Sequence, residues 1–369
     1  MGEFKSFFRA LADPRAGNHR HELLEILFIA LLATLCGAEG AADMARFGHS
    51  KEELLRRFLR LEHGVPSHDT FSRVFRLLDP VAFEGAFLKF VRAFARFSKL
   101  DLEGVIAIDG KSLRGAYDRG KSATPMHLVN VFAAEARLAL ASRKAPGRNE
   151  TKGALEVLKM LQLKHCIVAG DALFCSRSVA KAILGREGDY VLALKGNQNK
   201  LLTAVKRVFD GRASRHSAEQ LEPSVHDRRE WRRATVIRNK TIGIEQDFPG
   251  VAALGRVTSR RRPKSGKTSL VVRYYLLSTC LSAKKLLHTV RSRWAIENQL
   301  HWLLDVVLHE DANRARKDNA PEILAILRKL ALNLLRTHPE KISIRQKIKS
   351  AGWDDTFLLS LIGQLAHMR

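Results

Sequence analysis

Residues 105–109 are Val105-Ile106-Ala107-Ile108-Asp109, an apolar run that ends in an acid, and Cys166-Ile167-Val168-Ala169-Gly170-Asp171 repeats the pattern. Short apolar runs of this kind are typical of strands that helices cover on both faces of a sheet. In such sheets the carboxyl ends of the strands form the crevice where ligands bind. We therefore expect Asp109 and Asp171 each to end a buried strand, on one rim of the sheet. Taken singly, either acid is also a common turn former or helix cap.

The segments around these two runs predict a mixed α/β sheet. Periodicity and turn residues place further strands at 126–133, 137–141 and 190–194. Helical patterns occupy 149–161 and 176–184, and another begins near residue 199. Residues 210–280 differ, because an Arg-rich alternating stretch at 226–239 and a further run at 269–278 indicate a β-rich insertion. Between those strands, Arg260–Lys267 combines like charges with turn formers and is expected to form an exposed loop suited to phosphate contact.

The chain is strongly basic, with 63 Lys and Arg against 38 Asp and Glu and a formal net charge of +25. The excess runs along the whole length, which indicates a polyanionic partner such as a phosphate backbone. The alternative is a basic protein that is merely soluble. Cys36, Cys166, Cys175 and Cys280 have neither metal-ligand spacing nor a disulfide pattern, so a reducing, cytoplasmic setting is expected. The apolar run 27–36 is too short to span a membrane, and no targeting segment is expected.

Three regions are predicted along the chain. Residues 1–95 have only helical patterns and are expected to form a small helical domain. Within it, Ser50 and Glu53 fit a capping box for a helix to about residue 61, and Ser67 can cap the next helix. These two helices resemble a helix-turn-helix that binds DNA ends, or they simply pack together. Residues 96–345 form the α/β domain, and residues 346–369 are expected to be a basic tail.

A third acid, Glu297, interrupts an apolar helical stripe. A carboxylate on the core-facing side of a helix is costly unless a cation or hydrogen bonds compensate it. The alternative is a salt bridge to Arg291 or Arg293, or partial exposure at the edge of the stripe. The stripe follows spacings of three and four residues through Leu286, Val290, Trp294, Glu297, His301 and Leu304.

Asp109, Asp171 and Glu297 are a set of hard oxygen ligands without cysteine, the kind that Mg²⁺ or Mn²⁺ prefers. Two such ions about 4 Å apart can activate an attacking oxygen and stabilise a leaving oxygen in phosphodiester chemistry. Nearby polar and basic side chains could then face phosphates, although each singly could be an exposed solubilising group. Those candidates are Lys111, Arg114, Lys195, Asn197, Arg293 and the Arg-rich stretch from Arg228 and Arg229 to Arg233.

Several motifs resemble those of the DDE insertion-sequence transposases, specifically the ISAs-type subgroup that includes the H-repeat-associated proteins. The resemblance spans nearly the whole chain, including the Gly64–Phe71 turn near the N-terminus. The motifs are Ala107-Ile108-Asp109-Gly110-Lys111-Ser112-Leu113-Arg114-Gly115, Gly170-Asp171-Ala172, Tyr190-Val191-Leu192-Ala193-Leu194-Lys195-Gly196-Asn197-Gln198 and Arg293-Trp294-Ala295-Ile296-Glu297-Asn298-Gln299-Leu300-His301-Trp302.

The resemblance implies an RNase H-like catalytic core. Asp109 on the first strand, Asp171 after the fourth and Glu297 on a helix would form the metal-binding triad, with the β-rich insertion before the last acid. Similar enzymes bind the terminal inverted repeats of their element in double-stranded DNA. They expose 3′-hydroxyl ends by hydrolysis and join them to target DNA by transesterification. A homodimer on paired ends, in the cytoplasm at the nucleoid, is the corresponding expectation.

The sequence departs from the wider group's Tyr, Arg, Glu, Lys signature around the last acid. Val290 stands in the place of the Tyr and Leu304 in the place of the Lys, so His301 or Trp302 is the candidate to replace their DNA contacts. Asp305, two turns beyond Glu297, is a reserve candidate for the third ligand. Two other activities stay open: a metal-dependent nuclease without strand transfer, and an inactive copy that only binds DNA.

Overall fold

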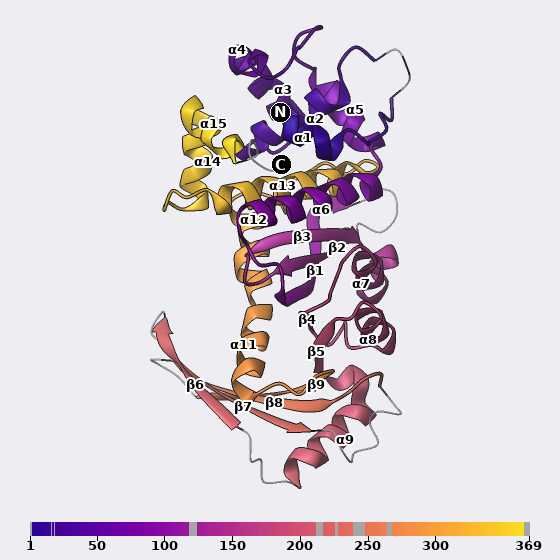
Figure 1. Ribbon diagram of the computed structural model, residues 1–369, viewed down its shortest axis with the longest axis vertical. Helices are drawn as coiled ribbons and strands as arrows, with labels where there is room; N and C mark the ends of the chain where they lie inside the picture. Colours follow the sequence, from indigo (N-terminus) through magenta and orange to yellow (C-terminus); the bar gives the residue numbers. More distant parts are fainter. Residues whose placement is uncertain are drawn as a thin grey trace.

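The structure is a computed structural model, and it describes residues 2–15, 17, 19–117, 124–211, 217–225, 228–238, 248–263 and 268–364. The molecule is elongated. Helices from both ends of the chain gather at the top of Figure 1, the central sheet lies in the middle, and strands β6 to β9 form the other end.

The first part of the chain is helical, as predicted. Ser67 caps α5 by accepting from the Thr70 N–H, but the predicted capping box at Ser50 is wrong. Ser50 ends one helix, and the next begins after Lys51 without a side-chain cap. The helices are α1 (Gly2–Phe8), α2 (Leu23–Leu35), α3 (Ala41–Ser50), α4 (Glu52–Arg56), α5 (His68–Leu77) and α6 (Pro80–Phe97).

The predicted mixed α/β sheet is confirmed, with an RNase H-like core. Nine strands form one sheet in the order β3-β2-β1-β4-β5-β9-β8-β7-β6. The first three are antiparallel, β4 and β5 run parallel to β1, and the insertion strands continue antiparallel from β5. The strands of the core are β1 (Gly104–Tyr117), β2 (Pro125–Ala133), β3 (Leu138–Lys144), β4 (Cys166–Gly170) and β5 (Asp189–Leu194). Those of the insertion are β6 (Ser217–Val225), β7 (Arg228–Arg238), β8 (Ala253–Pro263) and β9 (Ser269–Leu277).

Strand β1 is much longer than predicted. Asp171 directly follows β4, as expected, but Asp109 lies in the middle of β1 instead of at its end. The reason is a hairpin, because the residues after Asp109 continue to pair with β2 from Gly110↔Val129 to Leu113↔Met126. The expected loop at Arg260–Lys267 is also wrong in its first half, where β8 pairs with β7 and β9. Residues 264–267 lie outside the described residues.

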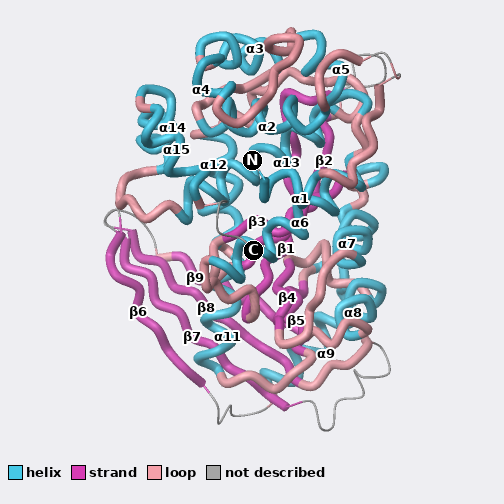
Figure 2. Tube along the Cα trace, turned by 45° about the horizontal axis from the view of Figure 1, so that its top comes forward, coloured by secondary structure: helices cyan, strands magenta, loops and turns pink. Residues whose placement is uncertain are grey.

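Helices cover the core sheet and connect it to the insertion. Helices α7 (Glu150–Lys159) and α8 (Arg177–Leu184) lie together beside the core strands, and α9 (Asn199–Asp210) leads into the insertion (Figure 2). Two short 3₁₀ turns, η1 (Pro146–Arg148) and η2 (Gly196–Gln198), precede α7 and α9. After β9, α11 (Ala283–Arg293) runs back along the molecule towards the helical end (Figure 1).

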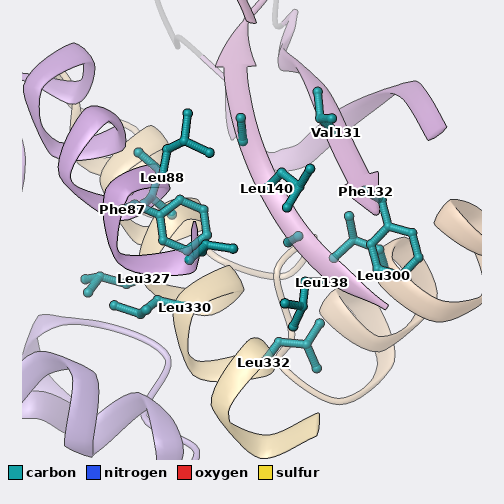
Figure 3. Close-up of a cluster of buried hydrophobic side chains, with 14 of the residues drawn as sticks. Phe87, Leu88, Val131, Phe132, Leu138, Leu140, Leu300, Leu327, Leu330 and Leu332 are labelled. Carbon is teal, nitrogen blue, oxygen red and sulfur yellow. The ribbon is translucent and has the colours of Figure 1, made fainter. Parts of the chain in front are cut away.

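The last third of the chain completes the hydrophobic core. It contains η3 (Ile296–His301), α12 (Trp302–Val306), α13 (Ala320–Thr337), α14 (Ile344–Trp353) and α15 (Asp355–Gly363). Leucines of α13 pack between α6 and the strand β3, with Leu300 of η3 beside Phe132 (Figure 3). The expected basic tail at 346–369 is wrong over its described residues. A capping box of Ser343 and Gln346 starts α14, and Leu358 and Leu361 of α15 are buried.

Candidate functional site

The sheet register brings two of the predicted acids to one place. Ile108 on β1 pairs with Gly170 on the parallel strand β4, so Asp109 and Asp171 are the next residue on each chain segment. The Oδ1 atom of Asp171 accepts from the Leu173 N–H at 2.8 Å. Asn197 Nδ2 donates to the Ala172 carbonyl at 2.8 Å. The turn that carries Asp171 is therefore held from within and from η2.

Glu297 reaches the same place from the opposite end of the domain, although not as predicted. The expected continuous helix is interrupted after Arg293, and Glu297 lies on the π-helical turn η3. That turn directs Ile296 and Leu300 into the core, so Glu297 keeps 39% of its side-chain exposure at the rim. Arg293 lies between two acids, with Nη2 3.7 Å from Glu297 Oε1 and Nη1 3.9 Å from Asp109 Oδ1. The salt bridge and partial exposure held open for Glu297 are both present.

The pKa of Asp109 depends on the charges of the other two acids. Burial raises the pKa of Asp109 to about 7; Arg293 opposes this shift, and the negative charges of Glu297, Asp171 and Glu150 add to it. When burial and like charges raise the pKa of a carboxyl group, an additional cation nearby would stabilise its ionised form. The position predicted for a metal is therefore a place where positive charge is favourable.

The donor chemistry at this place fits hard divalent cations. Asp109, Asp171 and Glu297 offer carboxylate oxygens, the ligands that Mg²⁺ and Mn²⁺ prefer. As the side chains stand, no three His, Cys, Asp or Glu groups among the described residues are arranged to hold an ion. The Arg293 guanidinium lies between Asp109 and Glu297 and supplies the positive charge there.

His301 lies behind Asp109 and does not face solvent as a DNA contact would. Its Nδ1 atom is 3.7 Å from Asp109 Oδ2, and its Nε2 atom is 3.1 Å from Asn130 Nδ2. Burial, with the nearby Lys111 charge, lowers the pKa of His301 to about 3, so the imidazole is neutral. Val290 and Leu304, at the signature positions, are buried in the core.

Lys111 is enclosed by carboxylates instead of standing free for phosphate. Its Nζ atom lies 2.6 Å from Asp305 Oδ1, 2.7 Å from Glu310 Oε2 and 3.4 Å from Asp311 Oδ1. The side chain is almost wholly buried. A phosphate contact would require these ion pairs to break, which argues against the expected role of Lys111. The reserve candidate Asp305 is engaged by Lys111, while Glu297 interacts electrostatically with Asp109.

The remaining predicted contacts are scattered. Arg114 is exposed and 3.4 Å from Asp311, and Lys195 is exposed at the end of β5. Arg228 and Arg229 lie on β7, which β9 and β8 separate from the core strand β5, and their side chains are outside the described part of the chain. The structure therefore does not bring all the predicted basic residues to the acids.

A pair that the sequence did not single out adjoins Gly110, the residue after Asp109. His127 Nε2 is 2.7 Å from Glu150 Oε1, which joins β2 to the start of α7. A methyl group on Gly110 would lie 2.5 Å from Glu150 Oε1 and 2.6 Å from His127 Nε2. The absence of a side chain at position 110 thus makes room for this pair next to the strand residue that follows Asp109. Neither residue lies in a motif, so no local signal could have identified the pair.

Comparisons with known proteins cover nearly the whole chain. The family described as DDE_Tnp_1-associated matches residues 5–91, and the family described as Transposase DDE domain matches residues 101–334. "Putative transposase YncI" of Escherichia coli O157:H7 is 32% identical over 95% of this chain and 92% of that protein. "H repeat-associated putative transposase YhhI" of Escherichia coli K12 is 32% identical over 93% of this chain and 92% of that protein.

Among solved structures, the cryo-EM structure of the piggyBac transposase synaptic complex with hairpin DNA is a distant match. Its TM-score is 0.41 at 14% sequence identity, over 99% of this chain and 80% of that chain.

Proposed function

The chain belongs to the family of DDE transposases, and on that premise we propose that it binds the terminal inverted repeats of an insertion sequence, cleaves DNA there and transfers the exposed ends. One observation carries the proposal: the register of β1 and β4 brings Asp109 beside Asp171, and Arg293 lies 3.9 Å from Asp109 and 3.7 Å from Glu297, which comes from a distant part of the chain. Three acids gathered in a chain of net charge +25 favour a site that takes cations and phosphates together.

Asp109, Asp171 and Glu297 would hold the metal ions. Two divalent ions held there would activate an attacking oxygen and stabilise a leaving oxygen in phosphodiester chemistry. Without metal ions, the positive charge of Arg293 compensates the charges of Asp109 and Glu297. Its guanidinium also suits a bidentate contact with a phosphate of the DNA end. Asn197 fixes the turn after Asp171 and so helps to position that carboxylate.

The DNA itself would be held by exposed cations of the sequence motifs. Arg114 and Lys195 are exposed; Arg114 belongs to the motif that contains Asp109, and Lys195 belongs to the motif that follows Asp171. His301 would instead help to orient Asp109 from the interior. A homodimer that holds two element ends together is the assembly we propose for strand transfer.

The test uses the DNA that flanks the coding region. We expect imperfect inverted repeats there, and we expect the purified protein to bind a duplex that carries them. In Mg²⁺ or Mn²⁺, the wild-type protein should cut this duplex and form joined products with a target plasmid. Cutting without joined products would favour a nuclease, and binding without cutting would favour an inactive copy.

One variant and a matched control test whether cleavage depends on Asp109. Asp109→Asn should retain binding and lose cleavage, because it removes an ionised ligand but keeps the side-chain volume. Asp210→Asn, at the exposed end of α9, is the matched control and should cut normally. Undiminished cutting by pure Asp109→Asn would defeat the proposed site.

A further inference from the structure

A groove of about 950 Å³ opens beside the β1–β2 hairpin and is lined by basic side chains. Its walls come from the ends of β1 and β2, the η1 turn and the segment that leads into α13. Neither the motifs nor the acid site includes its cations. The charged lining residues are Lys144, Arg148, Arg314, Arg316, Lys317 and Asp318.

The charges in this groove do not balance. Its one carboxylate, Asp318, is already paired with Arg76 of α5 at 2.7 Å. Arg316 is held in place, because its Nε donates to the Gly115 carbonyl at 2.8 Å and its guanidinium stacks 3.9 Å from the Tyr117 ring centre. Over the described part of the chain, four other cations of the lining form no ion pair. They are Lys144, Arg148, Arg314 and Lys317, and all four are exposed.

We propose that this groove binds the phosphate backbone of duplex DNA, which deepens the proposed function by naming a surface that holds its substrate. Several exposed cations spread over an open groove suit successive phosphates of a polymer better than one small anion. Arg316 provides a fixed guanidinium among them, and Arg suits phosphate geometry. Such contacts hold and orient DNA without reading its sequence.

The position of the groove connects it to two parts of the proposed enzyme. On one side, the ion pair Arg76–Asp318 and the hydrogen bond from Asn319 Nδ2 to the Leu78 carbonyl join its edge to α5. Arg73 of α5 is exposed, so DNA in the groove could continue onto the helix expected to recognise DNA ends. This continuity favours duplex DNA as the occupant.

On the other side, His127 lines the groove and forms the pair with Glu150. That pair is the one for which Gly110, the residue after Asp109, leaves room. The groove is thus linked to β1, the strand that carries Asp109, through this pair on β2 and α7. DNA held by the groove cations would lie along the β1–β2 hairpin, and β1 carries Asp109.

The test compares two double variants that remove the same charge. Arg314→Gln/Lys317→Gln removes two groove cations in the segment that leads into α13. Lys341→Gln/Arg345→Gln removes two exposed cations beyond the other end of α13, a helix of 18 residues. Because all four side chains are exposed, both double variants should keep the wild-type melting temperature, and this is checked first.

Binding of a fluorescent duplex of arbitrary sequence is then measured over a series of salt concentrations. Each lost phosphate contact should reduce the slope of log affinity against log salt by about 0.9, so the groove variant should lose about 1.8. The control variant should keep the wild-type slope. Equal slopes in the two variants would overturn the groove. This measurement detects DNA binding without metal, whereas the earlier test detects cleavage. A failure of the groove and a failure of the proposed cleavage activity can therefore be told apart.

Discussion

Lys111 Nζ lies 2.7 Å from Glu310 Oε2 inside the protein, where both side chains are almost wholly buried. The two residues are 199 positions apart in the sequence. Their pairing fixes β1, two residues beyond Asp109, to the segment that follows α12. The same Glu310 lies 3.7 Å from the buried Lys329 of α13. A buried ion network therefore holds the strand that carries one of the proposed catalytic acids.

Replacing Lys111 should destabilise the fold strongly. Lys111→Met leaves Glu310, Asp305 and Asp311 without their shared cation, and breaking a buried pair in this way costs about 3–5 kcal/mol. The double variant Lys111→Met/Glu310→Gln removes both charges of the closest buried pair and should be less destabilised than the two single losses added together. Urea unfolding of the four proteins measures the coupling. Additive losses would contradict the network.

The same network predicts a loss of stability in acid. Burial alone would raise the pKa of Glu310, but Lys329, Lys111 and Arg328 overcome it and lower that pKa to about 2. The stabilising effect is present above the ordinary value of 4.5 and is lost as the pH falls from there through 2. It amounts to about 3 kcal/mol. Unfolding at a series of pH values should show this loss in the wild type and not in Glu310→Gln.

The sequence predicted those parts of the fold that local patterns determine. Helix α8 begins after Ser176, which accepts from the Val179 N–H, and β4 ends at Gly170, as the helical pattern and the apolar run indicated. Asp171 was placed correctly for the same reason. Asp109 was not, because β1 extends to Tyr117 through pairing with β2, and pairing between strands is not a property of one segment.

The details of the site depended on contacts that no local pattern contains. The π-helical turn at Glu297 broke the regular period of the helix, so the acid came to the rim and not to the apolar stripe. Lys111 looked like a phosphate ligand because it follows Asp109, yet its partners Asp305, Glu310 and Asp311 come from a distant segment. The groove cations likewise come from two distant segments, 144–148 and 314–317.

A side chain at position 110 should impair cleavage more than folding. In Gly110→Ala the new methyl group would displace the ends of Glu150 and His127, which are flexible enough to move. Displacing groups beside Asp109 should lower the cleavage rate by roughly 10- to 100-fold. Gly363→Ala at the end of α15, where a methyl group meets nothing within 4 Å, is the control. A normal cleavage rate in Gly110→Ala would show that the pair does not position the site.

Two other glycines should respond in opposite directions. At Gly115 a methyl group would lie 2.3 Å from the Asn313 carbonyl oxygen and 2.8 Å from that of Asp311, and backbone cannot move aside cheaply. Gly115→Ala should therefore cost about 1–3 kcal/mol. At Gly85, in the middle of α6, nothing lies within 4 Å. Gly85→Ala should stabilise by about 0.5–1 kcal/mol, because alanine favours the helix. Equal changes in melting temperature would contradict the close approach at Gly115.

The contact that Glu84 of α6 makes with β3 should stabilise the fold less as the pH rises. This fully buried residue of α6 accepts from the Ser142 N–H of β3, and Arg143 Nε lies 3.2 Å from its other oxygen. Burial raises the pKa of Glu84 to about 8, and the hydrogen bond and Arg143 offset only part of that rise.

Between pH 4.5 and 8 the unfolded chain ionises Glu84 while the folded protein keeps it protonated, so stability is lost across that range. The loss approaches about 5 kcal/mol. Glu84→Gln keeps an acceptor for Ser142 but cannot ionise, so its stability relative to the wild type should rise from pH 4.5 to 8. The exposed Glu53→Gln should show no such trend. If unfolding gave Glu84→Gln and the wild type the same pH dependence, Glu84 would be ionised in the fold and Arg143 would compensate its burial.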